Sequence, residues 1–149
     1  MSSVGKNKKE KMLAIHRHWI WADRIRKEYF ELLKANPPAK DDMLDWFLNA
    51  DGMYMCLWYG LLFLVCEALK RSGFTVAQVQ AEIDAIYDSL RLFRNVIFHV
   101  NKKYFPKQMF VIMADPTSAT KITEAHEGIG KWFLTQIGTA PSVQQTKPS

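Results

Sequence analysis

The chain has few of the residues on which common metal, phosphate and nucleophile motifs depend. It contains two cysteines among 149 residues, and no Cys-x-x-Cys or His-x-x-x-His spacing occurs in it. It also has neither a glycine-rich phosphate loop nor a Gly-x-Ser-x-Gly nucleophile elbow. We therefore expect no metal site and no cofactor. Because cysteine is scarce and no cationic-then-apolar leader is present, the sequence disfavours a secreted disulfide scaffold and predicts a cytoplasmic protein.

A long uncharged run of the kind that spans a membrane is also missing. The stretch Met53–Cys66 has 14 residues without a charge, whereas a transmembrane helix needs roughly 18 to 20. We expect a central core helix here and no membrane association. Cys56 and Cys66 lie inside this stretch, so they are expected to be inert core thiols.

Apolar residues are plentiful enough for one core. Hydrophobic residues make up 48% of the chain and aromatic residues 13%, which indicates a single folded domain over residues 1–138. Residues 1–10 are expected to be a basic, frayed start. The segment 139–149 consists mostly of Pro, Ser, Gln, Thr and Lys, so it is predicted to be a disordered tail.

The net charge of +5 is unevenly distributed along the chain. Residues 1–34 carry nine basic and four acidic residues, residues 35–90 carry three and eight, and residues 91–109 carry five and none. The four lysines from Lys6 to Lys11 are expected to be a solvated helix start. In the acid-free block the basic residues surround His99 and several aromatics, a mixture typical of single-stranded nucleic acid binding.

Apolar residues recur at spacings of three and four in several segments, which predicts four principal helices. Pro37 and Pro38 end the first of them. The first row comprises Met12, Ile15, Trp19, Ala22, Ile25, Tyr29 and Leu32. The clearest row, typical of a helix in a bundle, comprises Val79, Ile83, Ile86, Leu90, Phe93 and Ile97. The last comprises Ile122, His126, Ile129, Phe133 and Ile137.

Turn-forming residues mark several boundaries and irregularities. Ser72-Gly73 predicts a helix C-terminus, and the segment Asp115–Ser118 predicts the start of the last helix. Gly128 and Gly130 lower the helix propensity there, so close packing or local irregularity is expected. The apolar run Met109–Met113 fits an extended strand or a packed loop, because its period does not separate the two.

The histidines do not form a metal site. His16 and His18 are two residues apart, about 200° around a helix, so we expect solvated or packed side chains. His126 lies in the apolar row of the last helix and is interpreted as a core histidine with satisfied hydrogen bonds.

The segment Arg94-Asn95-x-x-x-His99 is the strongest candidate for chemistry. Asn95 and His99 share a face of an ideal helix, whereas Arg94 and His99 differ by about 140°. Arg94 and His99 could still line one groove if the helix loosens near His99, or if a second copy of the helix supplies the opposite wall. A flanking row of Tyr87, Arg91, Arg94 and Phe98 favours a protein interface.

These residue types suit cleavage of RNA by its own 2′-OH. The reaction needs a proton acceptor, a proton donor and positive charge on the developing phosphorane. Histidine can exchange the proton, and the arginine fork fits a phosphate. Asn95 could orient either the imidazole or a phosphate oxygen, and no metal is required.

The motif and its helical context resemble the HEPN superfamily, whose members carry Arg, a polar residue, a short spacer and His. The resemblance implies a four- to five-helix up-and-down bundle that forms a homodimer with the motif at the interface. In active members it implies metal-independent endoribonuclease activity on RNA, common in toxin–antitoxin pairs and phage defence. Carried over, Arg94 would bind the scissile phosphate, Asn95 would support it, and His99 would act in proton transfer or phosphate positioning. Arg91, Lys102, Lys103 and Tyr104 are the expected RNA-binding residues.

One departure from the family concerns control. Many toxin members have a tyrosine two residues after the histidine, which a partner nucleotidyltransferase modifies; here Asn101 holds that position and Tyr104 lies further on. An antitoxin or nucleotidyltransferase partner therefore stays open. The alternative to a ribonuclease is a non-catalytic HEPN module that binds a nucleotide, RNA or a protein partner. A third reading is an unrelated helical interaction protein in which Arg94 and His99 are ordinary surface or dimer residues.

Overall fold

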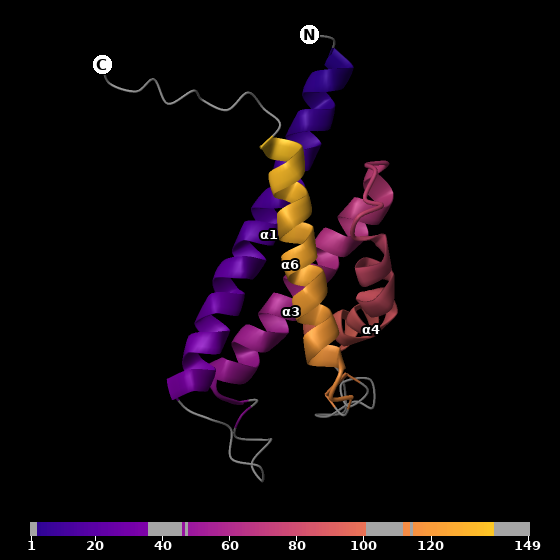
Figure 1. Cartoon of the computed structure of the whole chain (residues 1–149). Coiled ribbons are helices and arrows are strands. Elements are labelled where there is room, and N and C mark those ends of the chain that lie inside the picture. Colours follow the sequence, from indigo (N-terminus) through magenta and orange to yellow (C-terminus); the bar gives the residue numbers. More distant parts are fainter. Residues whose placement is uncertain (1–2, 36–45, 47, 101–111, 114, 139–149) are drawn as a thin grey trace, which may run out of the picture.

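The computed structural model describes residues 3–35, 46, 48–100, 112–113 and 115–138, and this part of the chain contains helices and no strand. Its four long helices are α1 (Ser3–Ala35), α3 (Ala50–Ser72), α4 (Gln80–Phe98) and α6 (Ser118–Ile137). Figure 1 shows that successive helices run in opposite directions. The predicted all-α helical bundle is confirmed. The tail 139–149 lies outside the described residues.

The central helix is α3, which packs against α1 and against α4. It is long and apolar enough to cross a membrane by length and composition, with a mean hydropathy of 1.6, but 61% of that apolar window is buried within the bundle. Such burial is what a core helix shows, because a lipid-facing span would keep its apolar surface exposed. Both cysteines are buried in α3 as free thiols, which confirms their predicted place in the core.

The predicted seam of α4 is buried as expected. Its fully enclosed side chains are Ile83, Ile86, Leu90 and Phe93, and Val79 and Ile97 also pack into the core. A spacing of three and four keeps these residues on one side of the helix, where they meet α3 and α6. On the flanking row, Tyr87 is tilted against Phe63 of α3, with 5.4 Å between the ring centroids.

Helix α1 also presents its predicted apolar row to the core. Ile15 and Ala22 are buried, and Trp19 and Tyr29 are partly buried against the core. The helix begins at Ser3, so it includes the segment expected to be a frayed start. All residues from Ser3 to Lys11 are exposed, and this end of α1 extends past the other helices in Figure 1.

The predicted helix boundaries are present in the backbone. Gly73 follows α3 with a φ of 76°, the left-handed conformation that favours glycine after a helix. The Ser72 hydroxyl donates to the Leu69 carbonyl at 2.7 Å and accepts from the Phe74 amide at 3.0 Å. Before α6, the Asp115 carboxylate accepts from the amide and hydroxyl of Thr117 at 2.9 and 2.8 Å. Both boundaries lie where the sequence predicts them.

Two helix contacts depend on glycine. A Cβ atom on Gly130 would collide with the Trp19 indole, and one on Gly60 would collide with the Phe98 ring. The close packing predicted at Gly130 is confirmed. From the apolar run 109–113, the structure describes Ile112 and Met113, which are helical with Ile112 buried. These two residues are therefore neither an extended strand nor a loop.

Candidate functional site

Arg94 lies between α4 and α3. Its guanidinium carbon is 4.8 Å from the centroid of the Phe63 ring, a cation–π contact. The Nε atom is buried and has no hydrogen-bond partner among the residues that the structure describes. Among the described residues no carboxylate pairs with this side chain. A guanidinium that is partly withdrawn from water without an anion carries a desolvation cost that a bound anion would offset.

Asn95 and His99 are both exposed at the same end of α4. The helix ends at Phe98, and His99 has an extended backbone with φ −123° and ψ 123°. The helical angle of about 140° between Arg94 and His99 therefore no longer applies, because His99 lies beyond the last helical residue. Within the described part of the chain, no hydrogen bond, ion pair or ring contact joins Arg94, Asn95 and His99 to one another.

The surroundings of this motif mix charge with exposed apolar surface. Arg91 is exposed and lies 3.9 Å from an Asp88 carboxylate oxygen. Leu92 is 37% exposed and Phe98 50% exposed. The remaining expected RNA-binding residues, Lys102, Lys103 and Tyr104, lie outside the described residues. The structure thus describes the arginine, the amide and the histidine at one end of α4, together with apolar side chains that the single chain leaves uncovered.

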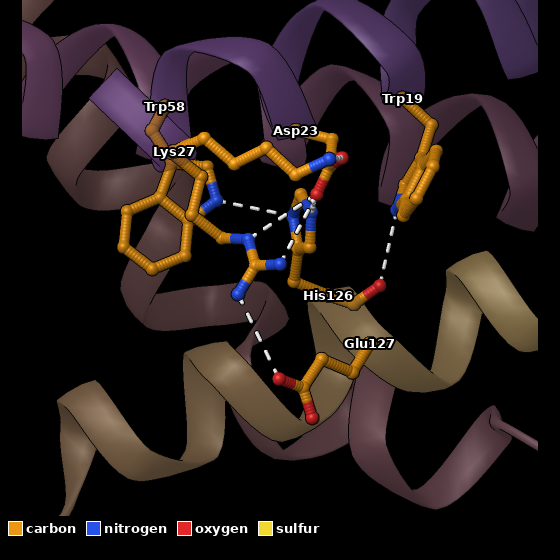
Figure 2. Close-up of polar contacts among 7 residues, drawn as sticks. Trp19, Asp23, Lys27, Trp58, His126 and Glu127 are labelled. Atoms are coloured by element: carbon orange, nitrogen blue, oxygen red, sulfur yellow. Dashed lines mark hydrogen bonds and ion pairs between the residues drawn. The ribbon is translucent and has the colours of Figure 1, made fainter. Parts of the chain in front are cut away.

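A second polar cluster lies where α1, α3 and α6 meet. Figure 2 shows His126 of α6 between Trp58 of α3 and Asp23 of α1. The Trp58 indole N–H donates to His126 Nδ1 at 3.1 Å, and His126 Nε2 lies 3.0 Å from Asp23 Oδ1. Because Nδ1 accepts from the indole, the ring proton is on Nε2 and is donated to the carboxylate. The Trp19 indole donates to the His126 carbonyl at 3.0 Å.

Cations surround the carboxylate in this cluster. Lys27 Nζ lies 2.9 Å from Asp23 Oδ2, and Arg26 donates to Oδ1 from Nε and from a terminal nitrogen at 3.3 and 3.1 Å. A longer ion pair of 3.7 Å joins Arg26 to Glu127. Burial alone would raise the pKa of Asp23, but hydrogen bonds from Lys27, His126 and Arg26 lower it overall.

His126 has no exposed surface. Burial lowers its pKa to about 4, and the Asp23 carboxylate offsets that effect only in part. The ring is therefore neutral near pH 7, and both of its nitrogens are engaged. It cannot exchange a proton with a substrate, so the cluster binds three helices together. The interpretation of His126 as a satisfied core histidine is confirmed.

An open cleft of about 320 Å³ lies beside this cluster, between α1 and α6. Its charged side is formed by Asp23, Arg26, Lys27, Glu127 and Lys131, and both carboxylates are ion-paired within the cluster. The rest of its wall includes His16 and Trp19. Because both carboxylates are ion-paired, neither is free to act as a general base.

The other titratable side chains of interest are packed or solvated. His16 is tilted against Phe133 with 4.8 Å between centroids, and an exposed His18 ring nitrogen lies 3.0 Å from the Ala14 carbonyl. Burial raises the pKa of both Cys56 and Cys66 to about 12, so neither is a ready thiolate. Within the described residues, no group of three His, Cys, Asp or Glu is placed to hold a metal ion.

The chain matches no family model, no curated protein and no solved structure. The likeness to the HEPN superfamily therefore rests on the motif and the helical pattern, and membership stays a prediction.

Sequence reasoning did not identify Asp23 and Trp58 as the partners of His126. The pairs are separated by 103 and 68 positions, which a local pattern cannot link. One local signal was available: Asp23 follows Trp19 by four residues, so a carboxylate lies next to the apolar row of α1. A charged side chain beside a buried row needs an ion-pair or hydrogen-bond partner, because burying it alone is unfavourable.

Proposed function

We propose that the chain is a homodimeric, metal-independent endoribonuclease of HEPN type that cleaves single-stranded RNA. The observation that carries this proposal is Arg94. Its guanidinium is held against Phe63 with a buried, unpartnered Nε, next to the exposed amide and imidazole of Asn95 and His99. A guanidinium without an anion among the described residues, beside an imidazole, suits a phosphodiester as ligand.

In the proposed reaction the ribose 2′-oxygen attacks the adjacent phosphorus and the bond to the 5′-oxygen breaks. The products are a 2′,3′-cyclic phosphate and a 5′-hydroxyl. Arg94 stabilises the negative charge that grows on the non-bridging oxygens. His99 transfers a proton at the attacking or the leaving oxygen, and Asn95 orients the phosphate or the imidazole.

The dimer supplies what one chain lacks. A single arginine and histidine provide one proton-transfer group, whereas the reaction has both an attacking and a leaving oxygen. Exposed Leu92 and Phe98 lie beside the motif, and burying them in a two-fold contact would bring two motifs to one groove. A toxin or phage-defence role, with an antitoxin or nucleotidyltransferase as partner, follows from the HEPN resemblance and is part of the proposal.

Purified protein is expected to cleave single-stranded RNA in the presence of EDTA and to leave cyclic phosphate ends. Arg94→Ala and His99→Ala should each lower the cleavage rate by about 100-fold or more, while circular dichroism shows an intact helical fold. Lys121→Ala, which removes an exposed cation from α6, is the matched control and should cleave as wild type does. Cleavage that survives both motif substitutions, or a wild-type protein without activity on varied RNAs, contradicts the proposal.

A specific observation favours a second candidate, a non-catalytic module that binds a nucleotide, RNA or a protein partner. Arg94 and His99 make no contact with each other within the described chain, as suits an anion site without coupled proton transfer. This reading predicts RNA binding without cleavage, with affinity that depends on Arg94 and falls as the salt concentration rises.

A further inference from the structure

The outward side of α1 carries cations that nothing in the described structure neutralises. We use the term α1 outer face for its exposed residues that recur at helical spacing: Lys6, Lys9, Glu10, Leu13, Arg17, Ile20, Trp21 and Arg24. None of the four cations in this set has an ion-pair partner among the described residues. Further along α1, Lys27 and Lys34 do pair with carboxylates. Lys8 and Lys11, beside this face, also have no ion-pair partner among the described residues, so the unbalanced positive charge belongs to the N-terminal part of α1.

The charge forms a line along a rigid rod. Between Ser3 and Ala22 the helix carries a single acidic residue, Glu10. With a rise of about 1.5 Å per residue, the distance from Lys6 to Arg24 is about 27 Å. That length matches several consecutive phosphates of an extended polynucleotide strand, whose charges attract such a line of cations.

The middle of the α1 outer face presents an aromatic surface. Trp21 is 47% exposed. The Arg17 guanidinium carbon lies 5.2 Å from the centroid of the Trp21 ring, and the His18 ring lies 5.1 Å from it at a tilted angle. An exposed indole beside a guanidinium and an imidazole offers both a stacking surface for a base and a donor for a phosphate.

We propose that the α1 outer face is a second RNA-binding surface, separate from the motif on α4, which holds single-stranded RNA by phosphate contacts and by stacking of a base on Trp21. The choice of RNA as ligand rests on the proposed function. Lys6, Lys9 and Arg24 contact phosphates, and Arg17 contacts the phosphate next to the stacked base.

The arrangement of apolar and charged side chains favours RNA over an anionic membrane surface. A helix that lies in a membrane interface needs a continuous apolar stripe that enters the lipid. Here the exposed apolar residues are Leu13, Ile20 and Trp21. Arg17 lies between Leu13 and Trp21 on the same line, and Arg24 follows one turn later, so the apolar stripe is interrupted. Inserting the apolar residues would force these guanidinium groups out of water, whereas an RNA strand contacts them together with the ring.

The test is fluorescence anisotropy with a labelled 20-nucleotide single-stranded RNA in EDTA, with every variant built on His99→Ala so that the RNA stays intact. Trp21→Ala should weaken binding by about tenfold, and Trp21→Phe should restore most of the affinity because it keeps an aromatic surface. The double variant Lys6→Gln/Lys9→Gln should reduce the slope of log affinity against log salt by about 1.4. Lys121→Ala on α6 is the control for loss of one exposed charge.

The results separate this inference from the ribonuclease proposal. Cleavage by the wild-type protein is measured in a separate assay. A protein that binds RNA through the α1 outer face but does not cleave it supports this inference and contradicts only the ribonuclease proposal. The inference is overturned if Trp21→Ala binds as tightly as Lys121→Ala, or if polyglutamate displaces the RNA as well as unlabelled RNA does. It is equally overturned if the protein sediments with vesicles of one part phosphatidylglycerol to three of phosphatidylcholine but does not bind RNA.

Discussion

His126 shows how a titratable side chain can become part of a helical core. It is completely buried, yet each ring nitrogen has a partner, Trp58 on one side and Asp23 on the other. Leaving such a ring unpaired would cost about 1 to 3 kcal/mol. The pairing therefore removes a penalty, and it does so through residues on three different helices. A pH-dependent contribution to stability follows from this burial.

We expect the free energy of unfolding to fall as the pH is lowered from about 6.5 towards 4. The folded pKa of His126 is about 4, below its ordinary value of 6.5. Between these two pH values His126 is protonated in the unfolded chain but not in the folded chain. Each pH unit in this window therefore lowers the free energy of unfolding by up to about 1.4 kcal/mol. Asp23, whose pKa is also lowered, adds a loss of stability only at still lower pH. Urea unfolding at a series of pH values measures the slope.

His126→Gln isolates this effect. The variant should be less stable at pH 7 by about 1 to 3 kcal/mol, because glutamine does not satisfy Trp58 and Asp23 in the same geometry. Between pH 6.5 and 4 its unfolding free energy should depend less steeply on pH, because unfolding takes up nearly one proton fewer than in the wild type. Burial also lowers the pKa of His16, so part of the slope should persist. An equal slope in wild type and His126→Gln would rule out this source.

At this scale the sequence predicts the environment of a residue better than its partner. His126 is assigned to the core because it occupies the apolar row of α6, and that assignment is confirmed. Its bond to Asp23 spans 103 positions, and the packing of Arg94 on Phe63 also joins two helices. Such contacts depend on how helices are rotated about their axes, and a periodic pattern defines that rotation only to within a broad face.

The helices follow their patterns because each apolar row covers one side only. The seam of α4 is confirmed along its length, and the break before α6 lies at the Asp115–Ser118 segment as predicted. The apolar run at 109–113 is the exception, since Ile112 and Met113 are helical. A run of five apolar residues is too short to show a period, so its conformation depends on tertiary contacts.

Glycine sets the distance between α1 and α6, which leads to a prediction for two neighbouring positions. In Gly130→Ala the new methyl group would collide with the Trp19 indole, whose N–H also bonds to the His126 carbonyl. We expect a loss of about 1 to 3 kcal/mol from this overpacking, despite the better helix propensity of alanine. Urea unfolding followed by circular dichroism measures the difference from wild type.

Gly128→Ala is the matched control in the same helix. A Cβ atom there would lie 3.3 Å from Val79 Cγ1, a tight contact that a small shift relieves. The gain in helix propensity should largely offset it, so the net change should stay within about 1 kcal/mol. Equal losses at the two positions would show that Trp19 does not limit the approach of the helices.

Across the whole molecule, the two proposed RNA sites lie on different helices. The α1 outer face runs along α1, and the motif with its exposed apolar neighbours Leu92 and Phe98 lies at the end of α4. Figure 1 places α1 and α4 on opposite sides of α6. If two chains join through α4, their α1 outer faces remain on the outside. Each chain has a net charge of +5, and the dimer would carry one basic α1 on each side of the central groove. The positive potential near the groove would then be stronger than the net charge of one chain suggests.

A substitution at the proposed dimer contact tests this arrangement. Leu92 and Asn95 are three residues apart in α4 and lie on the same side of the helix, so a charge at Leu92 enters the same contact as the motif. Wild-type protein should have twice the single-chain mass of 17.3 kDa by analytical ultracentrifugation. Leu92→Glu places two carboxylates across the two-fold axis and should weaken association by about 100-fold or more.

Cleavage of RNA should decline with the dimer fraction, because each groove needs both motifs. Leu134→Glu, at a leucine of α6 that is 69% exposed, changes the charge equally and should remain dimeric and active. Circular dichroism should show unchanged helix content in both variants, since each side chain is at the surface. A Leu92→Glu protein that stays dimeric would place the interface elsewhere. A monomeric one that still cleaves would show that Arg94 and His99 of a single chain complete the site without a partner.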